Sequence, residues 1–268
     1  MFPTFEFLGR EIGLYGVFAV IGLLFSGFVA YRLCKKFDIS FDDMILVMLT
    51  ALFGGFIIGH LIFALTNISE IIVIFRHIGE LWFKEFFVLL GTYIGGMVYY
   101  GGFIGGALGI VVYTHFAKSL SRKHLLDIFA VVMPLFHAFG RIGCFFGGCC
   151  YGIESEFGFT VTDNVLNPSI NGVNRFPVQL LESVLNLLIF LFLLYLIKKE
   201  KFSGNLLYIY MIIYPIVRFF DEFLRGDSYR GFLFGLSTSQ WISIILFVIG
   251  VTVLIIKKTQ KSRAQEST

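Results

Sequence analysis

The sequence predicts an all-α polytopic membrane protein with seven transmembrane helices. Of its 268 residues, 57% are hydrophobic and only 15% are charged, and phenylalanine alone occupies 34 positions. A typical soluble domain carries about 25% charged residues, so this composition excludes soluble enzymes, nucleic-acid binders and disordered chains. The net charge of +3 is too small to indicate a polyanionic partner. We therefore expect one integral-membrane domain over residues 1–268 and no nucleic-acid partner.

Each predicted helix is an apolar segment long enough to cross the hydrocarbon core of a bilayer, which takes about 20 residues. A cleaved signal peptide would begin with basic residues. Met1–Gly9 contains none, so we expect the first segment to stay in the membrane as an anchor. The seven segments are 12–33, 43–66, 96–117, 124–143, 178–198, 204–224 and 238–256.

Two regions between these segments have a different character. Residues 67–95 are apolar but are interrupted by several charges, which favours an amphipathic arm lying in the membrane interface over the alternative of an eighth span. Residues 144–177 are rich in Gly, Asn, Asp and Pro and form the only sizeable irregular head. We expect the first region to be an interfacial arm and the second to be a small extracytoplasmic head.

The distribution of lysine and arginine predicts the orientation. Most of the 21 basic residues fall in alternate loops, near residues 32–36, 118–123, 198–201 and 257–263. Cytoplasmic loops carry the excess of basic residues. The C-terminus is therefore expected in the cytoplasm and the N-terminus outside. Termini on opposite sides of the membrane require an odd number of spans, which agrees with seven.

This topology brings the polar residues of the spans to one layer of the membrane, at their outer ends. A charged side chain inside the hydrocarbon costs about 2.5–3.5 kcal/mol, so such residues are expected to face one another or a wet cavity. The alternative is that each one merely reaches the headgroup boundary. The residues concerned are Tyr15, Tyr99, Tyr100, Gly101, Gly102, His137, Arg141, Gln179, Glu182, Arg218, Asp221, Glu222, Arg225, Ser239 and Gln240.

The spacing of the arginines indicates a phosphate ligand. Arg218, Glu222 and Arg225 stand at i, i+4 and i+7, which predicts one stripe on one helix, and His137 and Arg141 are also four residues apart. Arginine binds phosphate through two parallel hydrogen bonds and keeps its charge. Carboxylates beside the arginines would hold them in place. The implied ligand is the headgroup of an anionic phospholipid.

Glycines crowd two places in the chain. Gly105 and Gly109 have the four-residue spacing that lets transmembrane helices pack closely. In the run from Gly140 to Gly152, glycines are too dense for a helix, and we expect their backbone N–H groups to approach an anion.

The cysteines match no regular motif. Cys144, Cys149 and Cys150 have neither zinc-ribbon nor C-x-x-C spacing, and Cys34 is far away in the sequence. Apolar packing, a disulfide and reactive thiols all remain open for them. We expect no metal and no cofactor.

Five segments, in order, resemble the prolipoprotein diacylglyceryl transferases over nearly the whole chain. The run G-R-I-G-C-F-F-G-G-C-C-Y-G at Gly140–Gly152 resembles the family signature G-R-x-G-N-F-x-N-x-E-x-x-G. The other segments are L-Y-G at Leu14–Gly16, G-G-M-V-Y-Y-G-G-F-I-G at Gly95–Gly105, R-F-P-V-Q-L-L-E at Arg175–Glu182, and the R-x-x-x-E-F-x-R pattern at Arg218–Arg225.

The resemblance implies a multi-pass enzyme of the bacterial cytoplasmic membrane. The family transfers the diacylglyceryl group of phosphatidylglycerol to the thiol of the lipobox cysteine in the signal peptide of a prolipoprotein, forming a thioether. Matching positions imply catalytic roles for Arg141 and Arg218. The remaining positions that the resemblance places at the phospholipid site are Tyr15, Gly101, Gly102, Gln179, Glu182, Glu222 and Arg225.

The sequence departs from the family at its expected base. The histidine before Gly101 is Tyr100 here, and a phenol titrates near pH 10. His137, one helical turn before Arg141, is an alternative proton acceptor, unless it is a core histidine. The signature asparagines are Cys144 and Gly147, and the signature glutamate is Cys149.

Two alternative functions remain. One is a paralogous membrane transferase that uses an anionic phospholipid with a different acceptor. The other is a lipid-binding or transport protein without chemistry. Transporters usually carry inverted repeats and polar residues at the midplane, whereas the polar residues here are predicted at one face, which disfavours transport.

Overall fold

The computed structural model describes residues 4–7, 9–79, 82–162, 164, 168–227 and 231–266. The chain divides into two compact units. Met1–Leu33 and Asp127–Thr268 form the first unit, and Cys34–Leu126 forms the second. The divisions fall inside two long helices, α1 (Leu14–Lys36) and α6 (Arg122–Gly147).

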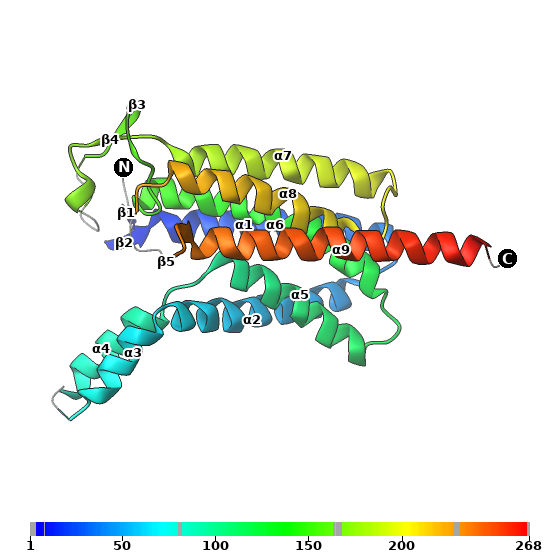
Figure 1. The fold of residues 1–268 in the computed structure, drawn as a ribbon, viewed down its shortest axis with the longest axis horizontal. Helices are drawn as coiled ribbons and strands as arrows, with labels where there is room; N and C mark the ends of the chain where they lie inside the picture. The colour runs from blue at the N-terminus through cyan, green and yellow to red at the C-terminus, as the bar shows by residue number, and fades with distance from the viewer. Residues whose placement is uncertain are drawn as a thin grey trace. The chain divides into compact units, whose positions relative to one another are not determined.

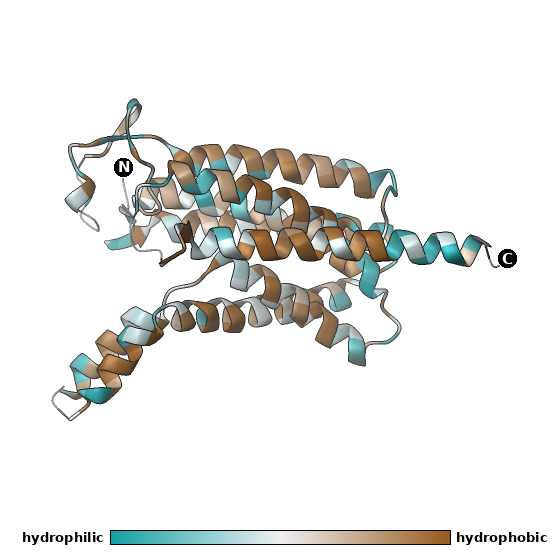
Figure 2. Cartoon of the chain, in the orientation of Figure 1, coloured by the Kyte–Doolittle hydropathy of each residue, from teal (hydrophilic) through white to brown (hydrophobic). Residues whose placement is uncertain are grey.

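The first unit is a bundle of long helices. It contains most of α1 and α6 together with α7 (Val178–Lys198), α8 (Leu206–Asp221) and α9 (Thr238–Glu266), which run alongside one another in Figure 1. Helix α8 packs against both α7 and α9. Large apolar side chains such as Leu188 and Ile245 remain exposed along these helices, and Figure 2 shows their middle portions as hydrophobic. Exposed apolar surface of this extent is typical of a protein surrounded by lipid rather than by water.

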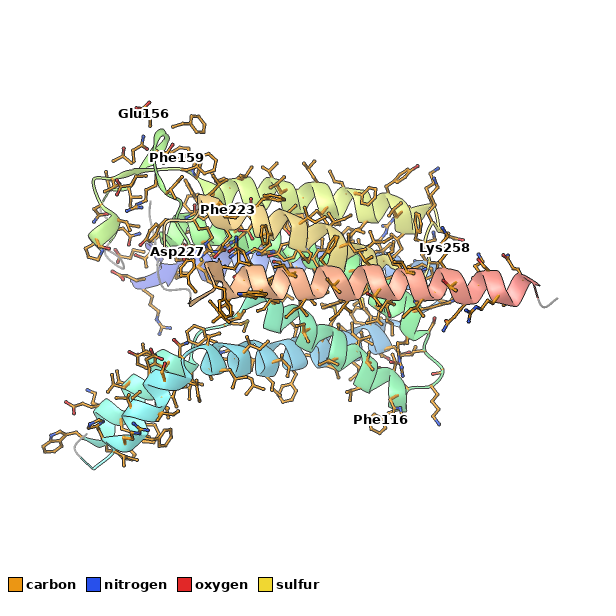
Figure 3. All side chains as sticks on the ribbon, viewed as in Figure 1. Phe116, Glu156, Phe159, Phe223, Asp227 and Lys258 are labelled. Atoms are coloured by element: carbon orange, nitrogen blue, oxygen red, sulfur yellow. The ribbon has the colours of Figure 1, made fainter. Side chains whose placement is uncertain are left out.

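Three small antiparallel sheets lie at one end of this bundle (Figure 1). At this end α1, α7 and α9 begin while α6 and α8 end. Figure 3 places Asp227 and Phe223 at the end that also carries Glu156 and Phe159, with Lys258 at the opposite end. The sheets pair β1 (Thr4–Phe7) with β2 (Arg10–Gly13), β3 (Glu154–Thr160) with β4 (Asn174–Arg175), and β5 (Phe232–Leu233) with β6 (Leu236–Ser237).

A buried aspartate anchors the opposite end of α8. Asp127 of α6 is 2% exposed, and its carboxylate accepts hydrogen bonds from the backbone N–H groups of Gly204 at 2.5 Å and Leu206 at 2.9 Å. The first N–H groups of a helix have no partner within that helix. Asp127 therefore satisfies the start of α8 and fixes it against α6.

The second unit pairs α2 (Phe41–Thr66) with α5 (Tyr99–Phe116), and glycines form their interface. A Cβ atom on Gly105 would collide with the carbonyl oxygen of Gly54, and one on Gly109 would collide with that of Thr50. The backbones touch directly, so the predicted packing role of these two glycines is confirmed. The expected arm at 67–95 contains the short helices α3 (Ile68–Arg76) and α4 (Phe83–Ile94).

The structure is that of an all-helical, multi-pass membrane protein. Helices α1, α2, α6, α7 and α9 are each long and apolar enough to cross a bilayer. Helices α4 and α5 are bent by 78° at a short break and would add a sixth span if they act together. All seven segments predicted as spans are helical, but α8 has only 16 residues.

Two local predictions are wrong. The run after Gly140 does not leave the helix, because α6 continues to Gly147. Gly143 serves packing instead, since a Cβ on it would lie 3.2 Å from the Cα of Tyr15 in α1. The irregular head therefore begins at Gly148 rather than at residue 144.

The predicted stripe of Arg218, Glu222 and Arg225 is also broken. Helix α8 ends at Asp221 and is followed by the 3₁₀ turn η2 (Glu222–Leu224). Arg225 then adopts an extended conformation and forms an isolated β-bridge with Gly152. The bridge turns the backbone away from the helical path, so Arg225 does not share a helix face with Arg218.

Candidate functional site

A buried ion pair joins α6 to α7 at the end of the first unit that carries the sheets. An Nη2 hydrogen of Arg141 is donated to Oε2 of Glu182, and Nε2 of His137 lies 3.6 Å from Oε1 of the same carboxylate. The four-residue spacing of His137 and Arg141 places both on one face of α6. All three side chains are buried, and Glu182 is 0% exposed. One carboxylate therefore serves both the guanidinium and the imidazole.

Polar groups next to Glu182 form one hydrogen bond across to α6 and one within α7. The Ser183 hydroxyl donates to the carbonyl oxygen of Ala138 at 2.9 Å, and the Asn186 amide donates to that of Glu182 at 2.8 Å. On the other side of His137, the ring of Tyr214 packs edge-on with centroids 5.4 Å apart. These contacts leave the Arg141–Glu182 pair little freedom to move.

A second buried ion pair lies at the end of α8. Nη2 of Arg218 is 2.5 Å from Oε2 of Glu222, and it also donates to the Ser239 hydroxyl of α9 at 3.2 Å. Glu182 interacts electrostatically with both Arg141 and Arg218 as well as with His137. The two ion pairs therefore form one cluster, built from α6, α7, α8 and α9.

Both arginines retain unused hydrogen-bond donors. Nε of Arg141 and Nη1 of Arg218 are buried and have no hydrogen-bond partner within the part of the chain that the structure describes. A buried polar group without a partner costs about 1–3 kcal/mol, and more when it is charged. Both arginines can therefore donate a further hydrogen bond, and a guanidinium group pairs well with an oxyanion.

The other predicted site residues of the first unit have different environments. Tyr15 is 51% exposed beside Gly143 of α6, and the Gln179 amide donates to the carbonyl oxygen of Cys149 at 2.9 Å. Arg225 forms two hydrogen bonds with Asp227, at 2.9 and 2.6 Å. Its carboxylate partner is thus the local Asp227, separate from the two pairs of the cluster.

Tyr100, Gly101 and Gly102 belong to the second unit, in the first turns of α5. The ring of Tyr100 lies 6.3 Å from that of Tyr99. A Cβ on Gly101 would lie 2.7 Å from the Cα of Gly59 in α2. In this unit Gly101 allows the close approach of two helices.

Sequence reasoning assigned no site role to several residues that the structure brings to the cluster. Asp221 is 3% exposed, its Oδ2 has no hydrogen-bond partner within the described residues, and it interacts electrostatically with Glu182 and Arg218. A signal existed, because a carboxylate or amide in a largely apolar helix demands a partner. The other residues in this group are Ser183, Asn186, Tyr214 and Ser239.

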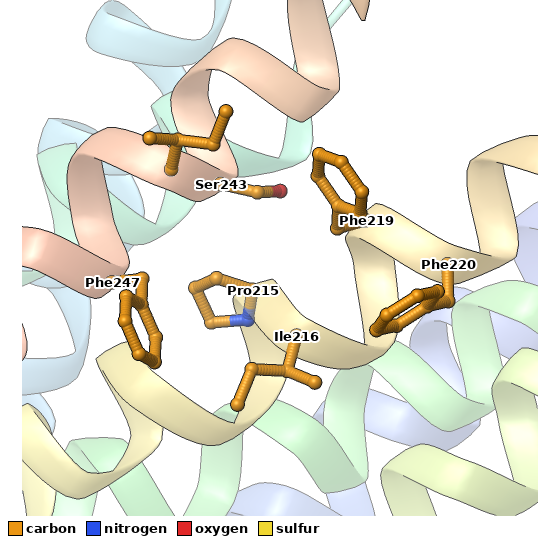
Figure 4. Close-up of a pocket in the computed structure, with 7 residues that line it drawn as sticks. Pro215, Ile216, Phe219, Phe220, Ser243 and Phe247 are labelled. Atoms are coloured by element: carbon orange, nitrogen blue, oxygen red, sulfur yellow. The ribbon is translucent and has the colours of Figure 1, made fainter.

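An apolar groove between α8 and α9 adjoins the turn that carries Arg218. Its volume is about 240 Å³, and Figure 4 shows its wall of aromatic and aliphatic side chains with one hydroxyl, that of Ser243. Such a wall suits a hydrocarbon chain rather than a polar group. The lining residues are Pro215, Ile216, Phe219, Phe220, Ser243, Ile244 and Phe247.

We expect Glu182→Ala to destabilise the protein by about 3–5 kcal/mol, because it leaves Arg141 buried without its counter-charge. Replacing both partners, as Glu182→Ala with Arg141→Met, should restore much of that loss. Chemical unfolding of the detergent-purified protein measures both values, and the exposed Glu156→Ala is the control. A double variant less stable than Glu182→Ala alone would contradict this account of the pair.

Comparison with known proteins identifies the family of this chain. The profile of the prolipoprotein diacylglyceryl transferase family matches residues 3–256. The phosphatidylglycerol–prolipoprotein diacylglyceryl transferase of Clostridium tetani is 32% identical over 262 residues, covering 96% of this chain and 98% of the relative. A second such transferase, from Clostridium perfringens, is 33% identical over 263 residues and covers 94% of each chain. The match thus includes the helices that carry both buried ion pairs, and the chain belongs to the prolipoprotein diacylglyceryl transferase family.

Proposed function

We propose that this protein transfers the diacylglyceryl group of phosphatidylglycerol to the lipobox cysteine thiol of a prolipoprotein. The relatives named above are transferases for these two substrates. The observation that carries the proposal is the pair of buried arginines, Arg141 and Arg218, each held by a carboxylate and each with an unused N–H donor within the described residues. A phospholipid phosphate supplies the acceptors that these donors need.

The carboxylates determine the charge of this site as much as the arginines do. With Glu182 and Glu222 each paired to one arginine, the site carries no large uncompensated positive charge. The binding of a phosphodiester then depends on hydrogen bonds from fixed donors rather than on net charge. Donors that are already oriented do not have to reorganise when charge develops on the ligand.

The transfer is a substitution at the glycerol carbon that bears the phosphate. The cysteine sulfur forms a C–S bond while the C–O bond to phosphate breaks, and the bonding electrons leave with the oxygen of glycerol phosphate. The thiol proton passes to a base. Negative charge grows on the departing phosphate. Arg141 and Arg218 therefore stabilise the transition state more strongly than they stabilise the bound lipid substrate.

We assign the proton acceptor to His137, which stands beside Glu182 in the cluster. A carboxylate next to an imidazole stabilises the imidazolium that forms when it accepts a proton. Asp221 is the competing candidate, because it is buried in the same cluster. Tyr100 occupies the position of the family histidine but carries a phenol.

The groove between α8 and α9 is proposed to hold one acyl chain of the donor lipid. It adjoins the helix turn of Arg218, and its wall is almost wholly apolar. A phosphate bound to Arg218 would therefore have hydrocarbon surface next to it. This arrangement suits an amphiphile rather than a free phosphate ion.

The proposed setting is the bacterial cytoplasmic membrane, with seven spans and the N-terminus outside. Helix α8 is short, but η2 extends it, and α5 is the span that follows the α3–α4 arm. The arm would lie in the interface, and the head after Gly148 would face outward. This orientation places both arginines at the leaflet where secreted prolipoproteins emerge.

We expect Arg141→Ala and Arg218→Ala each to lower the transfer rate by about 10²–10³-fold while the protein remains inserted, since each removes a donor to the leaving phosphate. Mass spectrometry of a lipobox peptide incubated with phosphatidylglycerol measures the thioether product. Lys258→Ala, at the far end of α9, is the matched control. Normal turnover by either arginine variant would refute the assigned role.

The identity of the base is tested by His137→Gln, Asp221→Asn and Tyr100→Phe. We expect His137→Gln to lower the rate by about 10²-fold or more, and the other two to change it by much less. Raising the pH should partly rescue His137→Gln, because the thiol then ionises without help. A large loss in Tyr100→Phe alone would move the base to Tyr100.

The orientation is tested by reporter fusions. An alkaline phosphatase fused within residues 161–164 should be active, and one fused at Lys199 should be inactive. The reason is that alkaline phosphatase is active only outside the cytoplasm. The opposite pattern would place the arginine cluster at the cytoplasmic leaflet and would contradict the proposed acceptor.

A further inference from the structure

Three of the four cysteines converge at the C-terminal end of α6. Cys144 lies in the last turn of the helix, and the chain then reverses through Gly148 and Cys150, which have positive φ angles of 69° and 56°. The N–H of Cys149 donates to the carbonyl oxygen of Cys144 at 3.2 Å. As a result, the three sulfur atoms lie within 4.8 Å of one another.

Apolar packing does not explain this cluster. Cys144 is buried, but Cys149 is exposed and Cys150 is partly exposed. A packing role therefore fits Cys144 alone. A binding site needs a ligand atom that is held in place and a path from solvent. The buried Cys144 supplies the first, and the exposed Cys149 supplies the second.

The spacing of the sulfur atoms suits a metal ion. Zinc–sulfur bonds of about 2.3 Å place sulfur atoms about 3.8–4.0 Å apart around a shared ion. The separations here are at most 4.8 Å, so the sulfur atoms are already close to the spacing that a shared ion needs. Three thiolates of this kind select a soft ion such as Zn²⁺ or Cu⁺ over Mg²⁺ or Ca²⁺.

The surroundings hold the turn in place and supply positive charge. The Gln179 amide from α7 donates to the carbonyl oxygen of Cys149 at 2.9 Å, and the Asn164 amide donates to that of Gly147 at 3.5 Å. Nη1 of Arg141 lies 4.0 Å from the Cys144 sulfur. A guanidinium at this distance favours the thiolate, which is the form that binds metals.

We propose that Cys144, Cys149 and Cys150 form a binding site for one thiophilic metal ion, coordinated by three sulfur atoms. Binding releases the thiol protons to solvent, so affinity rises with pH. The ion takes no part in the transfer reaction. It ties the last turn of α6 to the loop that follows, one helical turn beyond Arg141.

The test is a metal titration of the reduced, chelator-treated protein in detergent. Cd²⁺ alone should produce a sulfur-to-metal charge-transfer band that saturates at one ion per chain. X-ray absorption of the Zn²⁺-loaded protein should show three sulfur ligands at about 2.3 Å. Cys34→Ser, which removes a cysteine of the other unit, should leave both signals unchanged.

Cys149→Ser and Cys150→Ser should each weaken metal binding by more than about tenfold. Loss of a hydrogen-bond partner of a metal ligand already costs about 10–100-fold in affinity, and these variants remove a ligand itself. The same ions should raise the melting temperature of the wild type and of Cys34→Ser, but not of these two variants. Equal binding by Cys150→Ser and wild type would overturn the proposal. So would the absence of a charge-transfer band in reduced wild-type protein, whether or not the untreated protein contains a Cys144–Cys149 disulfide.

Discussion

The first unit depends on the burial of two guanidinium groups among helices whose exposed sides are largely apolar. Arg141 and Arg218 cannot remain there without counter-charges, so α7 must bring Glu182 to the height of Arg141, and η2 must return Glu222 to Arg218. Four helices are thereby held at one level. Their apolar sides impose no such register, because in lipid there is little hydrophobic force between helices.

The same pairs explain how a charged site can be both stable and receptive. Each carboxylate neutralises its arginine but occupies only part of the guanidinium fork, so Nε of Arg141 and Nη1 of Arg218 stay available. A fully satisfied network would be more stable and would bind nothing. The unused donors are the part of the cluster that we propose to serve a ligand, and the contacts of Arg141 with Glu182 and of Arg218 with Glu222 and Ser239 hold the two guanidinium groups in place.

The end of α6 combines an expected feature with an unexpected one. Arg141 stands where the family signature predicts an arginine, whereas cysteines replace an asparagine and a glutamate of that signature. The turn at Gly148 brings these cysteines together with Cys150. Positions that depart from a family pattern can therefore share one local structure, which a comparison of single positions does not reveal.

Hydropathy and charge spacing were enough to predict the helical membrane class, the approximate positions of the helices, and that Arg141, Glu182, Arg218 and Glu222 face one another as buried, paired charges. These features follow from the cost of exposing polar groups to hydrocarbon, and that cost acts on the sequence directly. The tertiary structure alone decided which carboxylate meets which arginine, that Gly143 packs against Tyr15 inside a continuous helix, and that Arg225 turns away to Asp227. Those outcomes depend on contacts between segments far apart in the chain, which local periodicity does not encode.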